Sequence, residues 1–322
     1  MAKLGLIEKI EQDADMRQLW NQLGEKRRQE LREIDTGKRV PNFLSDTMFK
    51  GIFNPDINAE RLSRFISSIL GKKIKVIHSL DKEGMRHSQY SKGIVLDILA
   101  EFENGAIGNV EIQRQGIAFP PKRAAVYSAN MLTRQYTSGE TSKKSEVDYN
   151  TVQPVYTIII MEQSPAEFRK SGAYIHHFRQ RSDTGLELEL LQYYDYICLD
   201  NFCRQRPCIV GELENWLTFL SLRDVEGMKE FLAREKSFQP VYDCAIMMLA
   251  NRKELMAMLS EMLANEDIVA SLNLTNESTI KRLQQEKQEI LKESERALRE
   301  KEAEIQRLKE QLKQIQSNIC GQ

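Results

Sequence analysis

The chain has little of what marks a zinc-binding or disulfide-rich protein. Its five cysteines are odd in number, and none stands in the paired C-x-x-C spacing of a zinc site. We therefore expect reduced thiols. Only four histidines occur. The adjacent pair His176 and His177 would face opposite sides of a strand, or lie about 100° apart on a helix, which is a poor geometry for holding one ion.

Long apolar runs are also absent. No stretch reaches the roughly 18 apolar residues of a membrane span, and the amino terminus MAKLGLIEKIEQDADMRQLW lacks the apolar core of a signal peptide. These absences predict a soluble, cytoplasmic protein. The formal net charge is only -1 although 29% of the residues are charged. A nucleic-acid surface would therefore depend on local clusters of Lys and Arg.

What is present suffices for one main globular domain with appendages, since 41% of 322 residues are hydrophobic. We predict a charged helical segment over residues 1–40, a main domain over 41–270 and a long charged helix over 275–320. Apolar spacing and turn residues predict the elements of the main domain. They are a short helix capped by Ser45 or Asp46, a helix over 57–70, strands over 73–80, 93–102 and 107–115, a helix over 121–136, a strand over 154–162, and mainly helices over 187–270.

This order is α, β, β, β, α, β, which predicts an α/β fold with a mixed sheet flanked by helices and followed by a helical extension. The tail from residue 277 lacks proline and glycine and is rich in Glu, Lys, Gln and Arg. Its apolar residues keep the 3 and 4 spacing of a coiled coil only near its end. It predicts either a homo-oligomer formed through the tail or a helix folded back on the body.

Two carboxylates stand in predicted strands, Asp97 in IVLDILA and Glu111 in NVEIQ. A carboxylate among Val, Ile and Leu is costly to bury unless it is paired or binds a cation. A salt bridge to Lys or Arg is one explanation of Asp97. The other is a divalent cation held by two oxygens from adjacent strands, as Mg²⁺ prefers.

The loop between these strands decides whether the two carboxylates share a face. A two-residue turn at Asn104-Gly105 would place Asp97 opposite Ile112 and send Glu111 to the wrong side of the sheet. A three-residue loop, Glu103-Asn104-Gly105 with Gly105 in the left-handed conformation, would pair Phe102 with Ala106 and place Asp97 opposite Glu111. Gln113 would then share their face. A metal site therefore predicts the odd-length loop.

Several segments together resemble a known family. DTMFKGIF, the strand LDI, EIQR after an Asn-Gly hairpin, the helix with Arg123 and Tyr127, and PVYTIII resemble the PD-(D/E)XK nuclease family transposases, also described as recombination-promoting nucleases. The resemblance covers roughly residues 42–270. It implies a restriction-endonuclease-like αβββαβ core.

The resemblance also implies a site and an activity. Asp97 and Glu111 would be the catalytic carboxylates and Mg²⁺ ligands, with the carbonyl of Ile112 as a third ligand and Mn²⁺ as a substitute ion. The implied reaction is hydrolysis of a DNA phosphodiester by a metal-activated water. Gln113 stands where the broad superfamily has lysine. A neutral amide would orient water or phosphate but supplies no charge.

Residues around this cluster are candidates for DNA contact or for an accessory role. Asp46 and Lys50 on the first short helix could approach the site, although Asp46 is equally well explained as a helix cap and Lys50 as a solvated side chain. Basic and polar residues beyond the motif could neutralise phosphates, or could be solvated charges. These are Arg114, Gln115, Lys122, Arg123 and Arg134. The basic and aromatic stretch KSGAYIHHFRQRSD suggests either a nucleic-acid contact or an ordinary loop.

Two other functions compete with hydrolysis. A nuclease-fold protein with weak or no activity could bind nucleic acid or assemble through its tail, which the missing lysine favours and the two carboxylates oppose. DNA strand transfer on an integrase-like fold needs three carboxylates, and only two are well placed here. Hydrolysis is therefore the preferred prediction.

Overall fold

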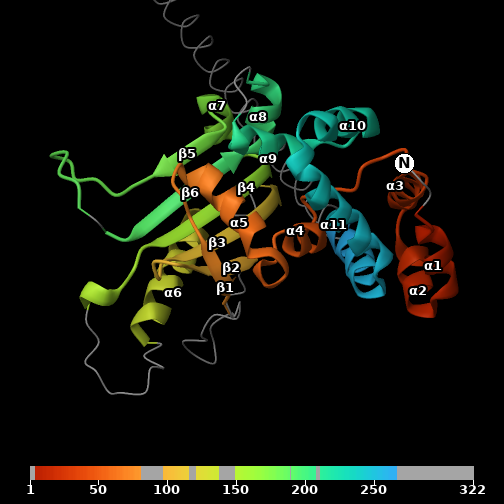
Figure 1. Ribbon diagram of the computed structural model, residues 1–322, viewed down its shortest axis with the longest axis horizontal. Coiled ribbons are helices and arrows are strands. Elements are labelled where there is room, and N and C mark those ends of the chain that lie inside the picture. Colours follow the sequence, from red (N-terminus) through yellow and green to blue (C-terminus); the bar gives the residue numbers. More distant parts are fainter. Residues whose placement is uncertain are drawn as a thin grey trace, which may run out of the picture. The chain divides into compact units, whose positions relative to one another are not determined.

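The computed structural model describes residues 4–80, 97–115, 121–137, 149–188, 190–207 and 211–266. Contacts divide the chain into two units, Met1–Met262 and Leu263–Gln322. The first unit holds the whole sheet and all labelled helices (Figure 1). The described residues of the second unit, 263–266, are helical. The coiled coil predicted over 275–320 lies outside the described residues.

A six-stranded mixed sheet forms the centre of the first unit, in the order β1-β2-β3-β4-β6-β5. Its strands are β1 (Val76–Ser79), β2 (Ile98–Phe102), β3 (Ile107–Gln115), β4 (Val155–Gln163), β5 (Ile175–Phe178) and β6 (Gln192–Cys198). The pairs β3/β4 and β4/β6 are parallel, whereas the other three pairs are antiparallel. The predicted mixed sheet is therefore confirmed.

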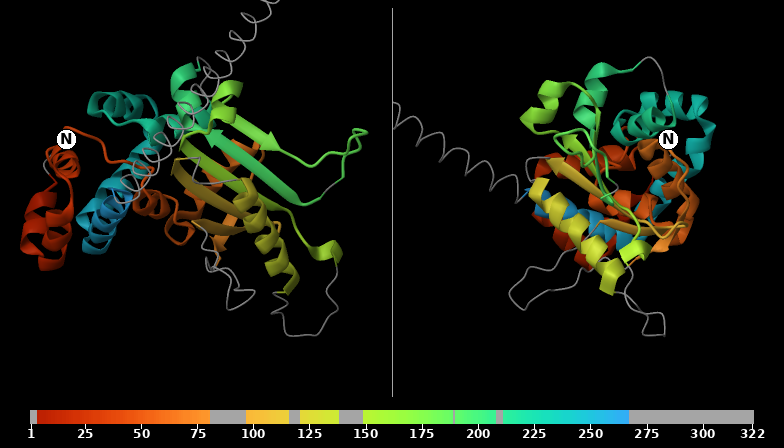
Figure 2. Two further views of the ribbon diagram at one scale, coloured as in Figure 1. Left: turned by 180° about the vertical axis from the view of Figure 1, so that it is seen from behind. Right: turned by 90° about the vertical axis from the view of Figure 1, so that its left-hand side faces the viewer.

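Helices cover both faces of this sheet. Two views from opposite sides show α5 in front of the strands in one and α6 in front in the other (Figures 1 and 2). The helices are α1 (Leu6–Gln12), α2 (Ala14–Gln22), α3 (Glu25–Asp35), α4 (Asp46–Ile52), α5 (Pro55–Leu70), α6 (Pro121–Thr137), α7 (Ala166–Ser171), α8 (Leu199–Gln205), α9 (Glu212–Ser221), α10 (Val225–Arg234) and α11 (Gln239–Ala250). A further helix runs through residues 252–266.

The elements that position the site follow from local sequence. Ser45 caps α4, since its hydroxyl accepts a hydrogen bond from Met48 N at 3.4 Å. Apolar residues at helical spacing bury one side of α5, and Gly71 ends this helix at φ +64°. Helix α6 begins at Pro121, where proline is tolerated because the first N–H of a helix has no intrahelical partner. These predictions are confirmed, with Ser45 rather than Asp46 as the cap.

Two strands were missed. The prediction that residues 187–270 are mainly helical is wrong at β6, which pairs with β4 along its whole length. The segment QYYDYIC is rich in aromatic and β-branched residues, which is typical of a strand. Strand β5 lies within the basic and aromatic stretch for which the sequence suggested either a nucleic-acid contact or an ordinary loop. It pairs with β6, where His177 Nδ1 lies 2.6 Å from the buried carboxylate of Asp195.

The charged amino-terminal segment is helical, as predicted, but divides into three helices. Gly5, Asp13 and Gly24 precede them as N-caps. Lys9 Nζ donates to the carbonyl of Ala250 at 2.9 Å, which ties this segment to the end of α11. Among the described residues, no helix has the length and apolar content needed to cross a membrane.

Candidate active site

The site is built on the hairpin of β2 and β3. Phe102 N donates to Ala106 O at 2.8 Å, Gly105 N donates to Phe102 O at 2.8 Å, and Gly105 has φ +81°. The loop is therefore Glu103-Asn104-Gly105. In the ladder, Ile98 pairs with Val110, so the next position places Asp97 opposite Glu111. The register that a metal site requires is confirmed.

Each carboxylate binds the backbone of the opposite strand. Asp97 N donates to Glu111 Oε1 at 3.1 Å, and Ile112 N donates to Asp97 Oδ2 at 3.0 Å. Glu111 is only 1% exposed, whereas the side chain of Asp97 keeps 17% of its surface in solvent. The two acids are thus held side by side, one buried and one partly exposed to solvent.

Asn109 is a member of the site that sequence reasoning missed. Its side chain is fully buried, and Nδ2 donates to Glu111 Oε1 at 3.0 Å. Its Oδ1 is buried without a hydrogen-bond partner in the described structure. The spacing N-x-E was an available signal, because residues two apart on a strand share a face. The hydrogen bonds from Asp97 N and Asn109 Nδ2 both go to Oε1 of Glu111.

Burial and repulsion make this carboxylate pair unfavourable without positive charge. Desolvation, followed by the charge of Asp97, raises the pKa of the Glu111 carboxyl from 4.5 to about 8. Arg123 and the Asn109 amide act in the opposite direction, but they do not overcome these effects. A nearby cation would therefore stabilise the ionised form of Glu111.

One cation is supplied by the chain itself. Lys50 Nζ, from α4, lies 3.1 Å from Asp97 Oδ1 and 2.7 Å from Asp46 Oδ1. Burial lowers the pKa of Lys50, but Asp97 and Asp46 together raise it above its ordinary value, so the ammonium stays charged. The predicted salt bridge of Asp97 is therefore present. Lys50 approaches the site and is not merely solvated, whereas Asp46 contacts Lys50.

The donor set fits a hard divalent cation. Two carboxylates face each other, and the N–H of Ile112 points to Asp97. In an antiparallel pair, the N–H and C=O of one residue point to the same neighbouring strand. The carbonyl of Ile112 therefore points, like its N–H, to the strand that carries Asp97. Oxygen donors of this kind suit Mg²⁺ and Mn²⁺. No cluster of three or more His, Cys, Asp or Glu side chains occurs among the described residues.

Gln113 and α6 complete the surroundings of the two acids. Gln113 is half-buried and lies two residues beyond Glu111, on the same face. Arg123 Nε donates to the hydroxyl of Tyr127 at 2.6 Å. The positive charge of Arg123 acts to lower the pKa of Glu111. Lys122 is exposed, and Arg134 lies about 17 Å beyond Arg123 along α6 at 1.5 Å per residue. The positive charge of Arg123 therefore acts on the Glu111 carboxylate.

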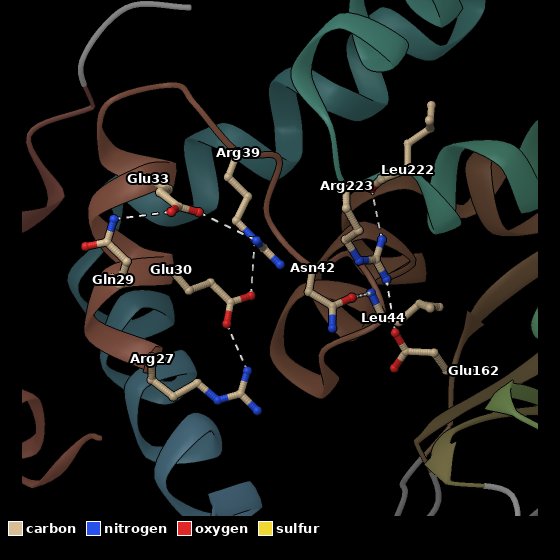
Figure 3. Close-up of polar contacts among 10 residues, drawn as sticks. All are labelled: Arg27, Gln29, Glu30, Glu33, Arg39, Asn42, Leu44, Glu162, Leu222 and Arg223. Carbon is tan, nitrogen blue, oxygen red and sulfur yellow. Dashed lines mark hydrogen bonds and ion pairs between the residues drawn. The ribbon is translucent and has the colours of Figure 1, made fainter. Parts of the chain in front are cut away.

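Arg114 lies on the opposite face of the sheet from Glu111 and Gln113. Its Nε lies 3.3 Å from Glu162 Oε2 on β4. The other carboxylate oxygen of Glu162 lies 3.4 Å from Arg223 Nη2, a contact that Figure 3 shows. Arg223 also donates to the carbonyls of Leu220 and Leu222. The structure therefore separates Arg114 from the other predicted site residues and places it in an ion-pair network.

Comparison with known proteins agrees with this geometry. A family model described as "PD-(D/E)XK nuclease family transposase" matches residues 43–275. Searches of curated proteins and of solved structures found no match. The matched range begins just before α4 and includes the hairpin with both carboxylates, but it leaves out α1, α2 and α3. Since the match spans more than half of the sequence, the chain belongs to the PD-(D/E)XK nuclease family transposases.

Proposed function

We propose that the chain is a Mg²⁺-dependent DNA endonuclease that hydrolyses phosphodiester bonds. Membership of a nuclease family suggests phosphodiesterase activity on DNA. The observation that carries the proposal is the pairing of Asp97 with Glu111 across the hairpin, with the ammonium of Lys50 at 3.1 Å from Asp97. In this proposal, the cellular role is recombination or the maintenance of mobile elements.

The two carboxylates and the Ile112 carbonyl are the proposed ligands of the ion. When bound, Mg²⁺ polarises the phosphate and lowers the pKa of a water molecule that attacks phosphorus. Asn109 holds the buried Glu111 carboxylate through Oε1. Binding the ion requires Glu111 to lose its proton, so metal affinity should rise with pH up to about 8.

Lys50 provides the positive charge that the neutral amide of Gln113 lacks. An ammonium beside Asp97 can stabilise the charge that develops on the phosphate oxygens during hydrolysis. Gln113, on the face of the two acids, can orient the water or a phosphate oxygen through its amide. The broad superfamily has lysine at the position of Gln113. In this chain, Lys50 on α4 supplies the positive charge in place of that lysine.

The proposed DNA path runs past α6. The positive charge of Arg123 acts on Glu111, exposed Lys122 stands beside Arg123 in sequence, and Arg134 lies further along the helix. Contacts of these residues to phosphate would be independent of base sequence. Arg114, which is paired with Glu162 on the other face, is a weaker candidate.

The first test is cleavage of supercoiled plasmid by the wild-type chain. We expect nicked or linear DNA with Mg²⁺ or Mn²⁺, no cleavage in EDTA, and recovery when the ion is added back. A gel assay separates these forms, and DNA ends should remain unjoined. No cleavage with either ion would contradict the proposal and favour a binding or assembly role.

Lys50→Met should lower the cleavage rate about 100-fold, the typical loss when one charge-stabilising donor is removed. The methionine keeps most of the aliphatic stem, so a folding defect should be small. Adding Gln113→Lys should restore part of the rate, because it places an ammonium on the face of Glu111. The matched control is Lys75→Met, which removes an exposed lysine paired with Glu103 in the hairpin loop. Equal rates for Lys50→Met and wild type would exclude this role.

A further inference from the structure

The helix through residues 252–266 reaches the amino-terminal end of α4. Glu261 Oε1 accepts a hydrogen bond from Asp46 N at 2.8 Å, and Oε2 accepts one from Thr47 N at 2.9 Å. The bonded residues are 215 and 214 positions apart in sequence. One carboxylate therefore binds the first two N–H groups of a helix from a distant part of the fold.

This contact has a clear physical basis. The first N–H groups of a helix have no intrahelical partner, and the helix dipole favours negative charge near them. Ser45 satisfies Met48 N, and Glu261 satisfies the two N–H groups before it. With seven residues, α4 is too short to be stable alone. Its orientation therefore depends on contacts made by the rest of the fold.

Apolar packing and hydrogen bonding hold α4 in different ways. Met48, Phe49 and Ile52 are buried and press the helix against the core. Such packing is not directional. The bonds to Glu261 are directional, so they constrain the rotation of α4 about its axis. Lys50 lies one turn after Asp46, and that rotation determines where its ammonium points.

We propose that Glu261 is a positioning residue, which orients α4 so that the ammonium of Lys50 meets Asp97. The inference rests on the proposed nuclease function, in which Lys50 stabilises charge on the phosphate. Glu261 itself is bonded to backbone N–H groups and acts only through α4. It links the carboxyl-terminal part of the family-matched region to the catalytic hairpin.

The activity test compares Glu261→Ala and Glu261→Gln with wild type. We expect kcat for plasmid cleavage to fall about 10-fold in the alanine variant and less in the glutamine variant, whose carbonyl can still accept one bond. KM should stay within about two-fold, because no proposed DNA contact changes. The control is Arg252→Ala on the same helix, which removes ion pairs to Asp13 and Asp15. It should leave kcat unchanged.

A double-mutant cycle tests whether Glu261 acts through Lys50. In a Lys50→Met background, Glu261→Ala should lower kcat less than about two-fold, because the group that it orients is gone. A general loss of stability would instead lower activity in both backgrounds alike. Additive effects would therefore overturn the proposal.

A measurement without DNA separates this proposal from the nuclease function. A carbodiimide joins an amine to a carboxylate in direct contact, so it should crosslink Lys50 to Asp97 in the wild type. We expect Glu261→Ala to lower the yield of that crosslink at least about three-fold by mass spectrometry, with the fold intact by circular dichroism. An unchanged yield would overturn the positioning role. If the wild type fails to cleave DNA, the nuclease proposal fails and the crosslink still decides the role of Glu261.

Discussion

Asp97→Asn should lower Mg²⁺-dependent DNA cleavage by about three powers of ten or more. The change replaces an anionic oxygen that faces Glu111 and Lys50 with a neutral amide of almost the same shape. An ion held by two carboxylates loses half of the charge that binds it. A fall of three powers of ten in rate corresponds to the loss of several kcal/mol of metal-assisted stabilisation of the transition state, because each power of ten equals about 1.4 kcal/mol. Rates of plasmid nicking, measured over a range of Mg²⁺ concentrations, provide the comparison.

The same strand offers a matched control for Asp97→Asn. Glu101 lies four residues further along β2 on the same face, where its carboxylate is 3.8 Å from His78 Nε2. Glu101→Gln should keep the wild-type rate. The asparagine oxygen at position 97 can still accept from Ile112 N, so circular dichroism should show an unchanged fold. Cleavage by Asp97→Asn at the wild-type rate would rule out the proposed metal ligand.

Glu111→Gln should remove a large part of the pH dependence of stability in the metal-free protein. Burial and the charge of Asp97 raise the pKa of the folded Glu111 carboxyl from 4.5 to about 8. The folded state therefore binds this proton more tightly than the unfolded state, and the free energy of unfolding falls as pH rises from 4.5 to 8. Between pH 5.5 and 8, Glu111 would account for a loss of up to about 3 kcal/mol, at about 1.4 kcal/mol per pH unit.

Urea unfolding in EDTA at several pH values measures this effect as the difference between wild type and Glu111→Gln. Mg²⁺ should stabilise the wild type more at pH 8 than at pH 6, and should stabilise the variant little. Glu103→Gln is the contrasting control on the same hairpin. Lys75 lowers the pKa of the exposed Glu103 carboxyl, so the stability that ionised Glu103 contributes is lost as pH falls. Parallel curves for wild type and Glu111→Gln would show that Glu111 does not carry a raised pKa.

The hairpin shows how far sequence reasoning could reach. The residues Glu103-Asn104-Gly105 allow two loops, and only one places Asp97 opposite Glu111. Requiring a shared face for the acids selected the three-residue loop, which the hydrogen bonds of Phe102 and Gly105 confirm. The prediction succeeded because turn chemistry and strand alternation are local. Strand β6 shows the opposite case, because helical patterns follow its short aromatic segment and the whole region was predicted to be mainly helical.

The sequence by itself predicted most of the local elements and limited the hairpin to two registers, of which one places Asp97, Glu111 and Gln113 on the same face. These depend on backbone periods and turns of a few residues. Only the tertiary structure decided that Lys50 meets Asp97, that Glu261 caps the helix carrying Lys50, and that Arg114 pairs with Glu162 away from the site. The direction of a long charged side chain depends on packing between elements far apart in the chain. No local pattern encodes that packing.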